Sequence, residues 1–216
     1  MRPTRELARL RRDVAAYLGR LREQAANVLA DNSPHSRRVF SHVTIELLNT
    51  WAAFSRSFYL SCVIRPRRMR GGRIVATAFT GAGFNDAIGV AMARHRPSRP
   101  PLPGGGWNRR DEPTWHDIAV LLTSCTDLGC SNLTQIQAAL STGTGVFNNL
   151  PPFRNFFAHR NSATAQSARN AASSYTVPTA GRHPADILRQ RPHGRPFPIL
   201  LEWIDDVDVT VELMCE

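Results

Sequence analysis

Two long runs of helical periodicity near the start of the chain constrain the fold more than any other feature. Over residues 5–30, and again over about 36–64, apolar side chains recur every three or four positions, which places them on one face of a helix. Only a short turn at 31–36, with a proline suited to a helix start, separates the two runs. Two long helices joined by a short turn predict an antiparallel hairpin.

Weaker helical patterns follow. A glycine turn at Gly81–Gly83 precedes one of them; Asp86 occupies the position where a dinucleotide-binding loop needs a small residue, so we expect only a tight turn. Thr114–Asp117 resembles a capping box, and Asn132 is placed to cap another helix. The remaining expectations are helices ending near 128 and 140, a loop over 141–152 whose prolines open a helix that runs to about 175, and a short helical turn within 183–198. We also expect a C-terminal helix over 199–216, although the run 207–211 would fit a strand by alternation as well.

These elements together predict an all-α fold, an antiparallel helical bundle with loop-rich insertions. The chain of 216 residues suits a single domain over 1–216. The segment 96–113 holds five prolines and three glycines and predicts a long loop. The closing segment 199–216 carries six acidic residues, which we expect to pair with the arginines of the first helix.

The charge of the chain favours a polyanionic partner. Its formal net charge is +10, and all 27 basic residues are arginines. Arginine suits phosphate because its planar fork donates two hydrogen bonds at once, and nucleic acid is the commonest polyanion. In the arginine-rich loop 65–73, Arg67, Arg68 and Arg70 are candidates for RNA-phosphate contact. A solvated basic turn is the alternative interpretation of this loop.

Several other classes of protein are disfavoured. Cys125 and Cys130 have four residues between them and no second pair nearby, so we expect no metal site and free thiols in a reducing cytosol. The charged N-terminus has no apolar signal core. The longest apolar-rich run, 43–64, is interrupted by charged and polar residues, which argues against a membrane span. We therefore expect a cytoplasmic protein without a membrane partner.

The sequence PPFRNFFAHRN at 151–161 is the strongest functional signal. Arg154, Asn155 and His159 stand among three phenylalanines that suit a buried helix face. Because each residue turns a helix by about 100°, Asn155 and His159 lie on one face, and Arg154 flanks the same strip. A similar spacing occurs from Arg37 to His42, but it lacks the amide after the arginine, and we interpret it as a chance match.

This stretch resembles the hallmark motif of the HEPN superfamily (higher eukaryotes and prokaryotes nucleotide-binding). That motif is an arginine, usually followed by a polar residue, and then a histidine after four to six intervening residues. Arg154-Asn155-Phe-Phe-Ala-His159 has four residues between the arginine and the histidine. The resemblance is specific over about ten residues and architectural elsewhere, and it implies a HEPN-like bundle.

The resemblance also implies metal-independent endoribonuclease activity without a cofactor. His159 would exchange protons with the ribose 2′-hydroxyl or the leaving 5′-oxygen, since histidine titrates near neutral pH. Arg154 would hold the scissile phosphate, and Asn155 would orient the histidine or the phosphate. The products would carry 2′,3′-cyclic phosphate and 5′-hydroxyl ends. Arg160 extends the polar face and is a further candidate for binding RNA phosphate.

Partners follow from the same resemblance. Two motif helices would face each other across a homodimer to form one composite site on RNA. The family context suggests a bacterial toxin–antitoxin or anti-phage defence effector, with an antitoxin or sensor protein as a possible partner. The alternative is a non-catalytic HEPN-like protein that binds RNA or a protein partner.

Overall fold

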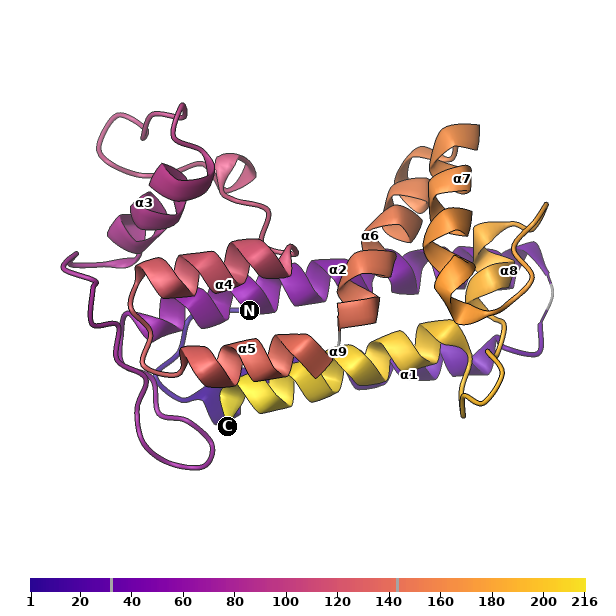
Figure 1. Ribbon diagram of the computed structural model, residues 1–216, viewed down its shortest axis with the longest axis horizontal. Helices are drawn as coiled ribbons and strands as arrows, with labels where there is room; N and C mark the ends of the chain where they lie inside the picture. The colour runs from indigo at the N-terminus through magenta and orange to yellow at the C-terminus, as the bar shows by residue number, and fades with distance from the viewer. Residues whose placement is uncertain (32, 143) are drawn as a thin grey trace. The chain divides into compact units, whose positions relative to one another are not determined.

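The computed structural model describes residues 1–31, 33–142 and 144–216 and is all-α, as expected (Figure 1). Within these residues the only β-type pairing is a few isolated bridges in loops. Asn32, in the predicted 31–36 turn, and Gly143, in the predicted 141–152 loop, lie outside the described residues. None of the described helices combines the length and apolarity that crossing a membrane requires.

The chain divides into two compact units. Unit 1 comprises Met1–Val14, Trp51–Thr142 and Thr210–Glu216, and unit 2 comprises Ala15–Thr50 and Gly143–Val209. The single domain expected from the sequence stays a prediction.

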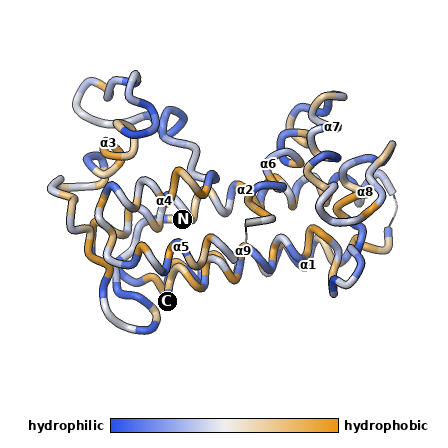
Figure 2. The backbone as a smooth tube through the Cα atoms, in the orientation of Figure 1, coloured by the Kyte–Doolittle hydropathy of each residue, from blue (hydrophilic) through white to orange (hydrophobic). Residues whose placement is uncertain are grey.

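The long periodic runs form helices close to the expected bounds. They are α1 (Leu7–Asn27), α2 (Pro34–Cys62) and the C-terminal α9 (Ile199–Cys215), and each contributes residues to both units. Figure 2 shows hydrophobic and hydrophilic residues alternating along α1 and α9. The expected helix for 199–216 is therefore confirmed, because its three- and four-residue spacing buries more apolar side chains than strand alternation would.

In unit 1, three shorter helices follow, of which the second contacts both the first and the third. They are α3 (Phe84–His95), α4 (Ile118–Asp127) and α5 (Leu133–Thr142), with the short 3-10 helix η1 (Arg109–Asp111) inside the long loop at 96–113. The buried Tyr59 of α2 donates a hydrogen bond to the Ala87 carbonyl at 2.6 Å and thereby fixes α3. The Trp51 indole likewise donates to the His116 carbonyl at 3.0 Å, just before α4.

Two helix starts in unit 1 clarify the capping signals. The Asp86 carboxylate accepts hydrogen bonds from the Ala82 and Gly83 amides, so this residue closes the glycine turn before α3, as the tight-turn interpretation requires. The capping box predicted at Thr114 was wrong by one turn. Asp117 is itself the N-cap of α4 and accepts from the Ala119 amide at 2.8 Å, because a short carboxylate reaches the second amide of the helix it begins.

In unit 2, α6 (Thr144–His159) and α7 (Ser162–Ala171) lie side by side, followed by the 3-10 helix η2 (Ala172–Tyr175) and the short α8 (Pro184–Leu188) (Figure 1). Aromatic contacts hold α6 against α9: the Phe153 and Trp203 rings meet edge to face with their centroids 5.3 Å apart. The Trp203 indole donates to the Tyr175 hydroxyl at 2.7 Å, which adds η2 to the same core.

The prediction of a helix from Pro151 to about residue 175 was wrong at both its start and its end. In the structure α6 already begins at Thr144, and Pro151 and Pro152 lie inside it. The buried Val146, Phe147 and Leu150 explain the early start, because the apolar face they form offsets the hydrogen bonds that the prolines remove. The helix also ends at His159 and does not continue to Tyr175.

The acidic α9 pairs with the arginines of α1, as expected. In unit 1, the Arg11 guanidinium lies 3.0 Å from the Glu212 carboxylate. In unit 2, Arg22 donates two hydrogen bonds to Asp205, at 2.9 and 3.3 Å.

A largely buried ion pair lies in unit 1. Arg56 of α2 donates to both carboxylate oxygens of Glu112, at 2.6 and 2.7 Å, and the Trp115 indole donates to the same carboxylate at 2.8 Å. The Glu112 side chain is only 3% exposed. Its charge is therefore compensated by these donors and not by water.

We predict that Arg56→Met lowers the free energy of unfolding by about 3–5 kcal/mol, because it leaves a buried carboxylate without its counter-ion. Chemical denaturation would measure this change. Arg70→Met is the matched control: its partner is Glu216 but its side chain is 76% exposed, so the decrease should stay below about 1 kcal/mol. Adding Glu112→Gln to Arg56→Met should restore part of the stability, and equal effects of the two arginine variants would contradict the prediction.

Candidate functional site

The motif residues lie in the last two turns of α6, on its outer side. The three phenylalanines between and before them are buried, whereas Asn155 and His159 are exposed and Arg154 is half-buried. Their side chains make no hydrogen bond or ion pair with any residue that the structure describes. These residues therefore share the exposed side of an amphipathic helix, and their groups are available to a ligand.

The helix ends immediately after His159 for local reasons. Arg160 adopts a left-handed backbone conformation with φ of 41°, and its amide donates to the Phe156 carbonyl at 2.7 Å. Asn161 then caps α7: its side chain accepts from the Thr164 amide at 2.9 Å, and Thr164 accepts in return from the Asn161 amide. The capping box is visible in the sequence, but the prediction of one continuous helix to about residue 175 overlooked it.

The end of α6 meets the start of α2 at a small pocket of about 180 Å³. We call it the basic pocket. Its lining consists of Pro34, Arg37, Arg38, Ser41, Arg160 and His183. The positive end of the α2 dipole adds to the charge of Arg38 and Arg160, so the basic pocket favours an anion. His42 lies outside it and borders an adjoining hollow that shares Arg38 with the basic pocket.

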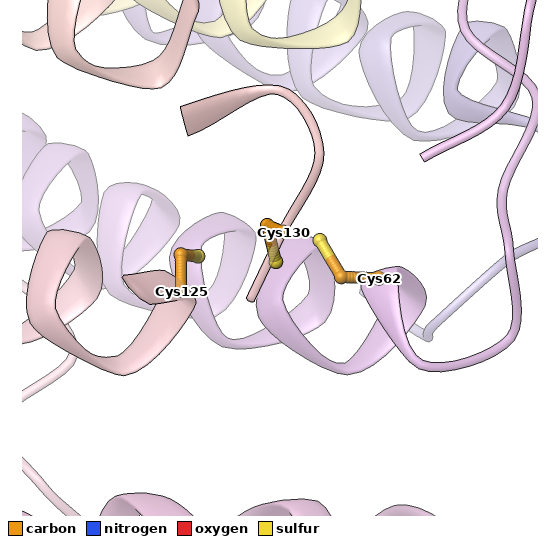
Figure 3. A group of neighbouring side chains, drawn as sticks. All are labelled: Cys62, Cys125 and Cys130. Atoms are coloured by element: carbon orange, nitrogen blue, oxygen red, sulfur yellow. The ribbon is translucent and has the colours of Figure 1, made fainter. Parts of the chain in front are cut away.

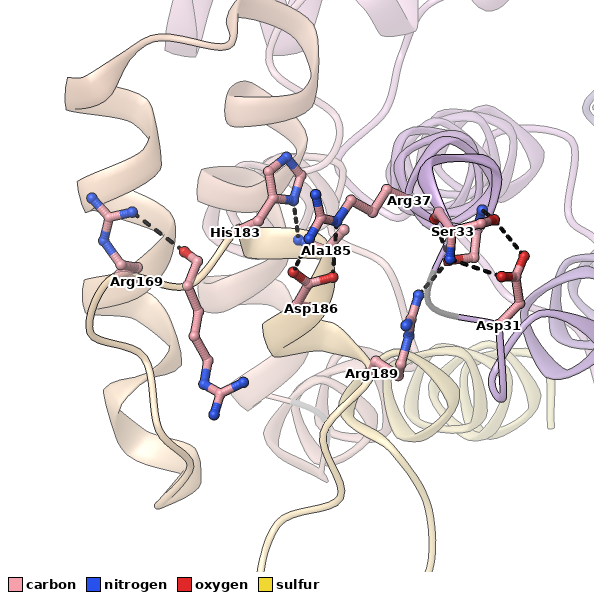
Figure 4. A network of polar contacts seen from close by, with 10 residues as sticks. Asp31, Ser33, Arg37, Arg169, His183, Ala185, Asp186 and Arg189 are labelled. Atoms are coloured by element: carbon pink, nitrogen blue, oxygen red, sulfur yellow. Dashed lines mark hydrogen bonds and ion pairs between the residues drawn. The ribbon is translucent and has the colours of Figure 1, made fainter.

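The arginines of the basic pocket are not equivalent. Arg37 donates to both carboxylate oxygens of Asp186, at 3.1 and 2.7 Å, and Figure 4 shows the two side chains facing each other. This pairing raises the pKa of Arg37, first through the hydrogen bonds and then through the charge of Asp186. By contrast, Arg38 and Arg160 are exposed and have no hydrogen-bond or ion-pair partner among the described residues. They are the guanidinium groups left to bind a ligand.

His183 supplies the uncharged donor of the basic pocket. Its Nδ1 accepts a hydrogen bond from the Ala185 amide at 3.2 Å, which caps α8 and leaves the proton of the neutral ring on Nε2. Its ring packs edge to face on Phe156 of the motif helix, with centroids 5.2 Å apart. Burial lowers the pKa of His183, the charges of Arg37 and Arg160 lower it further, and Asp186 raises it in part.

The remaining predicted RNA contacts lie in unit 1, in the loop 65–73. Arg68 donates to the Gln135 side chain at 3.2 Å, and Arg70 forms an ion pair with Glu216. The side chain of Arg67 is exposed, whereas its backbone pairs with Arg5 and Leu7 beside α1. The loop is thus anchored to the rest of unit 1, and the guanidinium groups of Arg65 and Arg67 have no partner among the described residues.

Sequence reasoning missed the contributions of α2 and of His183 to the basic pocket. A signal existed for His183, because a polar residue directly before Pro184 and Ala185 is typical of a helix start. No comparable signal linked Arg37 and Arg38 to Arg160, which is more than a hundred residues away in the chain. Within the described residues, one group of side chains could hold a metal ion, and it consists of three cysteines in unit 1.

Comparisons with known proteins add no relative to this description: no family model, no curated protein and no solved structure matches the chain.

The environment of His183 predicts a pH dependence of stability. Because the pKa of His183 is lowered in the folded state, the unfolded chain binds more protons at this residue as the pH falls below about 6.5. Acidification from about pH 7.5 to about 5.5 should therefore reduce the free energy of unfolding. His183→Asn keeps a cap for the Ala185 amide without titrating, so its stability should fall less over the same range. Parallel curves for the two proteins, measured by chemical denaturation, would contradict the assignment.

Proposed function

We propose that the chain is a metal-independent endoribonuclease of HEPN type. The observation that carries the proposal is the last turns of α6, where Arg154, Asn155 and His159 face outward without partners among the described residues, beside Arg160 of the basic pocket. An outward helix face is normally polar, so the support lies in the residue types and their spacing, which match the motif.

The proposed reaction is transfer of the phosphoryl group within the RNA strand. The ribose 2′-oxygen attacks the phosphorus and loses its proton to a histidine, and the bond to the 5′-oxygen breaks as that oxygen gains a proton. The products are a 2′,3′-cyclic phosphate and a 5′-hydroxyl. Arg154 stabilises the charge that builds on the phosphate oxygens, and Asn155 holds the histidine or the phosphate in position.

One exposed helix end supplies a single copy of the motif, so the proposed enzyme acts as a homodimer. In that arrangement one His159 accepts the proton of the 2′-hydroxyl and the His159 of the second copy donates a proton to the leaving oxygen. The proposed setting is the cytoplasm of a bacterium, where RNA cleavage would make the protein a toxin or an anti-phage defence effector controlled by an antitoxin or sensor.

The basic pocket favours a second candidate function, RNA binding without cleavage. Arg38, Arg160 and the neutral His183 form a site for a phosphate group whether or not His159 takes part in chemistry. Binding and cleavage therefore need separate measurements.

We predict that His159→Ala abolishes cleavage of single-stranded RNA while the fold remains intact, because an exposed side chain contributes little packing. Arg154→Ala should reduce the rate by about 10²- to 10³-fold, the usual cost of losing one donor to a developing anion. Cleavage in magnesium-free buffer and analysis of the product ends would measure both effects.

His42→Ala is the control for this prediction. It removes the histidine of the second arginine–histidine spacing, which lies outside the basic pocket, and should leave the cleavage rate unchanged. If wild type and His159→Ala bind RNA equally and neither cleaves it, the non-catalytic function is correct. Cleavage that needs an added divalent ion would refute the proposed chemistry.

We also predict that Arg38→Gln with Arg160→Gln weakens RNA binding at low salt and flattens its salt dependence. Removing one arginine–phosphate interaction with a single strand lowers the slope of log K against log salt by about 0.7. The matched variant, Arg68→Gln with Arg70→Gln, should have a smaller effect because both arginines already have partners in unit 1. Fluorescence anisotropy at several salt concentrations would measure the RNA affinity of both double variants. A larger loss of affinity in the loop variant would show that the loop, and not the basic pocket, is the main RNA-binding surface.

A further inference from the structure

Three of the four cysteines meet at one point in the core of unit 1. The sulfur atoms of Cys62, Cys125 and Cys130 all lie within 4.8 Å of one another, and all three residues are buried. Figure 3 shows the side chains of Cys62 and Cys125 directed toward Cys130. The sequence pattern pointed only to the Cys125/Cys130 pair, because Cys62 is more than sixty residues away in the chain.

Three different elements supply these sulfurs. Cys62 is the last residue of α2, Cys125 lies in α4, and Cys130 follows the turn that ends α4. Gly129 makes that turn possible with a left-handed φ of 65°, and the Cys130 amide donates to the Cys125 carbonyl at 3.1 Å. A bridge between Ala76 and Cys130 holds the other side of the turn. Backbone hydrogen bonds therefore fix the turn that carries Cys130.

We propose that Cys62, Cys125 and Cys130 form a binding site for a thiophilic d¹⁰ metal ion, Zn²⁺ or Cu⁺, held by three thiolates. Zinc–sulfur bonds of about 2.3 Å in tetrahedral geometry place the sulfurs about 3.8 Å apart. The observed limit of 4.8 Å is close enough for small side-chain rotations to close the site. Thiolates select Zn²⁺ and Cu⁺ over hard cations such as Mg²⁺.

The chemistry of the cluster suits a cation. A metal ion binds cysteine as the thiolate, so binding at this cluster releases thiol protons to solvent.

The fourth cysteine, Cys215, is an isolated buried thiol and provides a comparison for the cluster. Cys215 is also buried, but burial raises its pKa to about 12, so it stays an uncharged, apolar-like side chain. Three thiols dispersed in the same way would fill the core equally well. Their convergence on one point is the feature that packing alone does not require.

The two ions differ in the number of ligands they require. The metal-binding group contains no fourth cysteine, histidine or carboxylate from the described residues. Cu⁺ is satisfied by three thiolates, whereas Zn²⁺ would complete its tetrahedron with a non-protein ligand such as water. Either ion would tie the end of α2 to α4 and the following turn, so its first effect is to stabilise unit 1.

The test uses the full chain, purified with a reductant and stripped of metal. Titration with Zn²⁺ and, separately and without oxygen, with Cu⁺ should give one equivalent bound and a higher melting temperature. X-ray absorption of the loaded wild type should count three sulfur neighbours at about 2.3 Å for the zinc form. Three sulfurs plus one light atom would identify the zinc arrangement, and three sulfurs alone the copper arrangement.

Cys130→Ser and Cys215→Ser form the matched pair of variants. Cys130→Ser should lower the affinity for the ion by more than about 100-fold, because losing a ligand exceeds the cost of losing a group that only supports a ligand. Cys215→Ser should bind as wild type does. The proposal is overturned if wild type takes up neither ion, if the two variants bind alike, or if absorption finds fewer than three sulfurs around the bound ion. The last measurement needs no variant and decides the matter even where Cys130→Ser fails to fold.

Discussion

Burial of the apolar side of α2 is the constraint on which the rest of the structure depends. Along one helix of 29 residues, Phe40, Val43 and Leu47 are fully buried in unit 2, and Trp51, Phe54 and Phe58 are fully buried in unit 1. A helix with so wide an apolar side is not stable alone in water, so the other helices of each unit cover this side. Both candidate sites lie at ends of this same element: the basic pocket begins at Pro34 and Arg37, and the cysteine cluster includes the terminal Cys62.

Polar and reactive groups in this protein are concentrated where helices stop. Arg160 and His183 both flank helix ends, and each owes its position to backbone geometry: a left-handed residue after α6 in one case and an N-cap in the other. Helix ends leave backbone groups unpaired and turn the chain sharply, so side chains there can converge from several elements. Cys130, which directly follows the turn after α4, obeys the same rule. This convergence gives a helical fold its chemical sites without interrupting its core.

The two candidate sites handle charge in opposite ways. In the basic pocket Arg38 and Arg160 are exposed, so water solvates their charges. A phosphate group can displace this water. The cysteine cluster gathers three thiols in the core of unit 1, where the thiolates formed on metal binding would be neutralised by the ion and not by water. The proposed functions of the two sites follow from this difference: a reversible contact with a polyanion in one, and a permanent structural ion in the other.

The sequence by itself determined the helices and the motif that lies on one of them. Periodic apolar residues identified α1, α2 and α9 close to their observed bounds, and the spacing of Arg154, Asn155 and His159 on one side of a helix was legible because helical geometry is local. Only the tertiary structure decided that α6 continues through Pro151, since the burial of Phe147 and Leu150 outweighs the local preference of proline. It alone brought Arg38 to Arg160, and Cys62 to Cys125 and Cys130. These long-range contacts depend on how distant helices pack against one another. That packing is determined by the whole core and cannot be predicted from a short stretch of sequence.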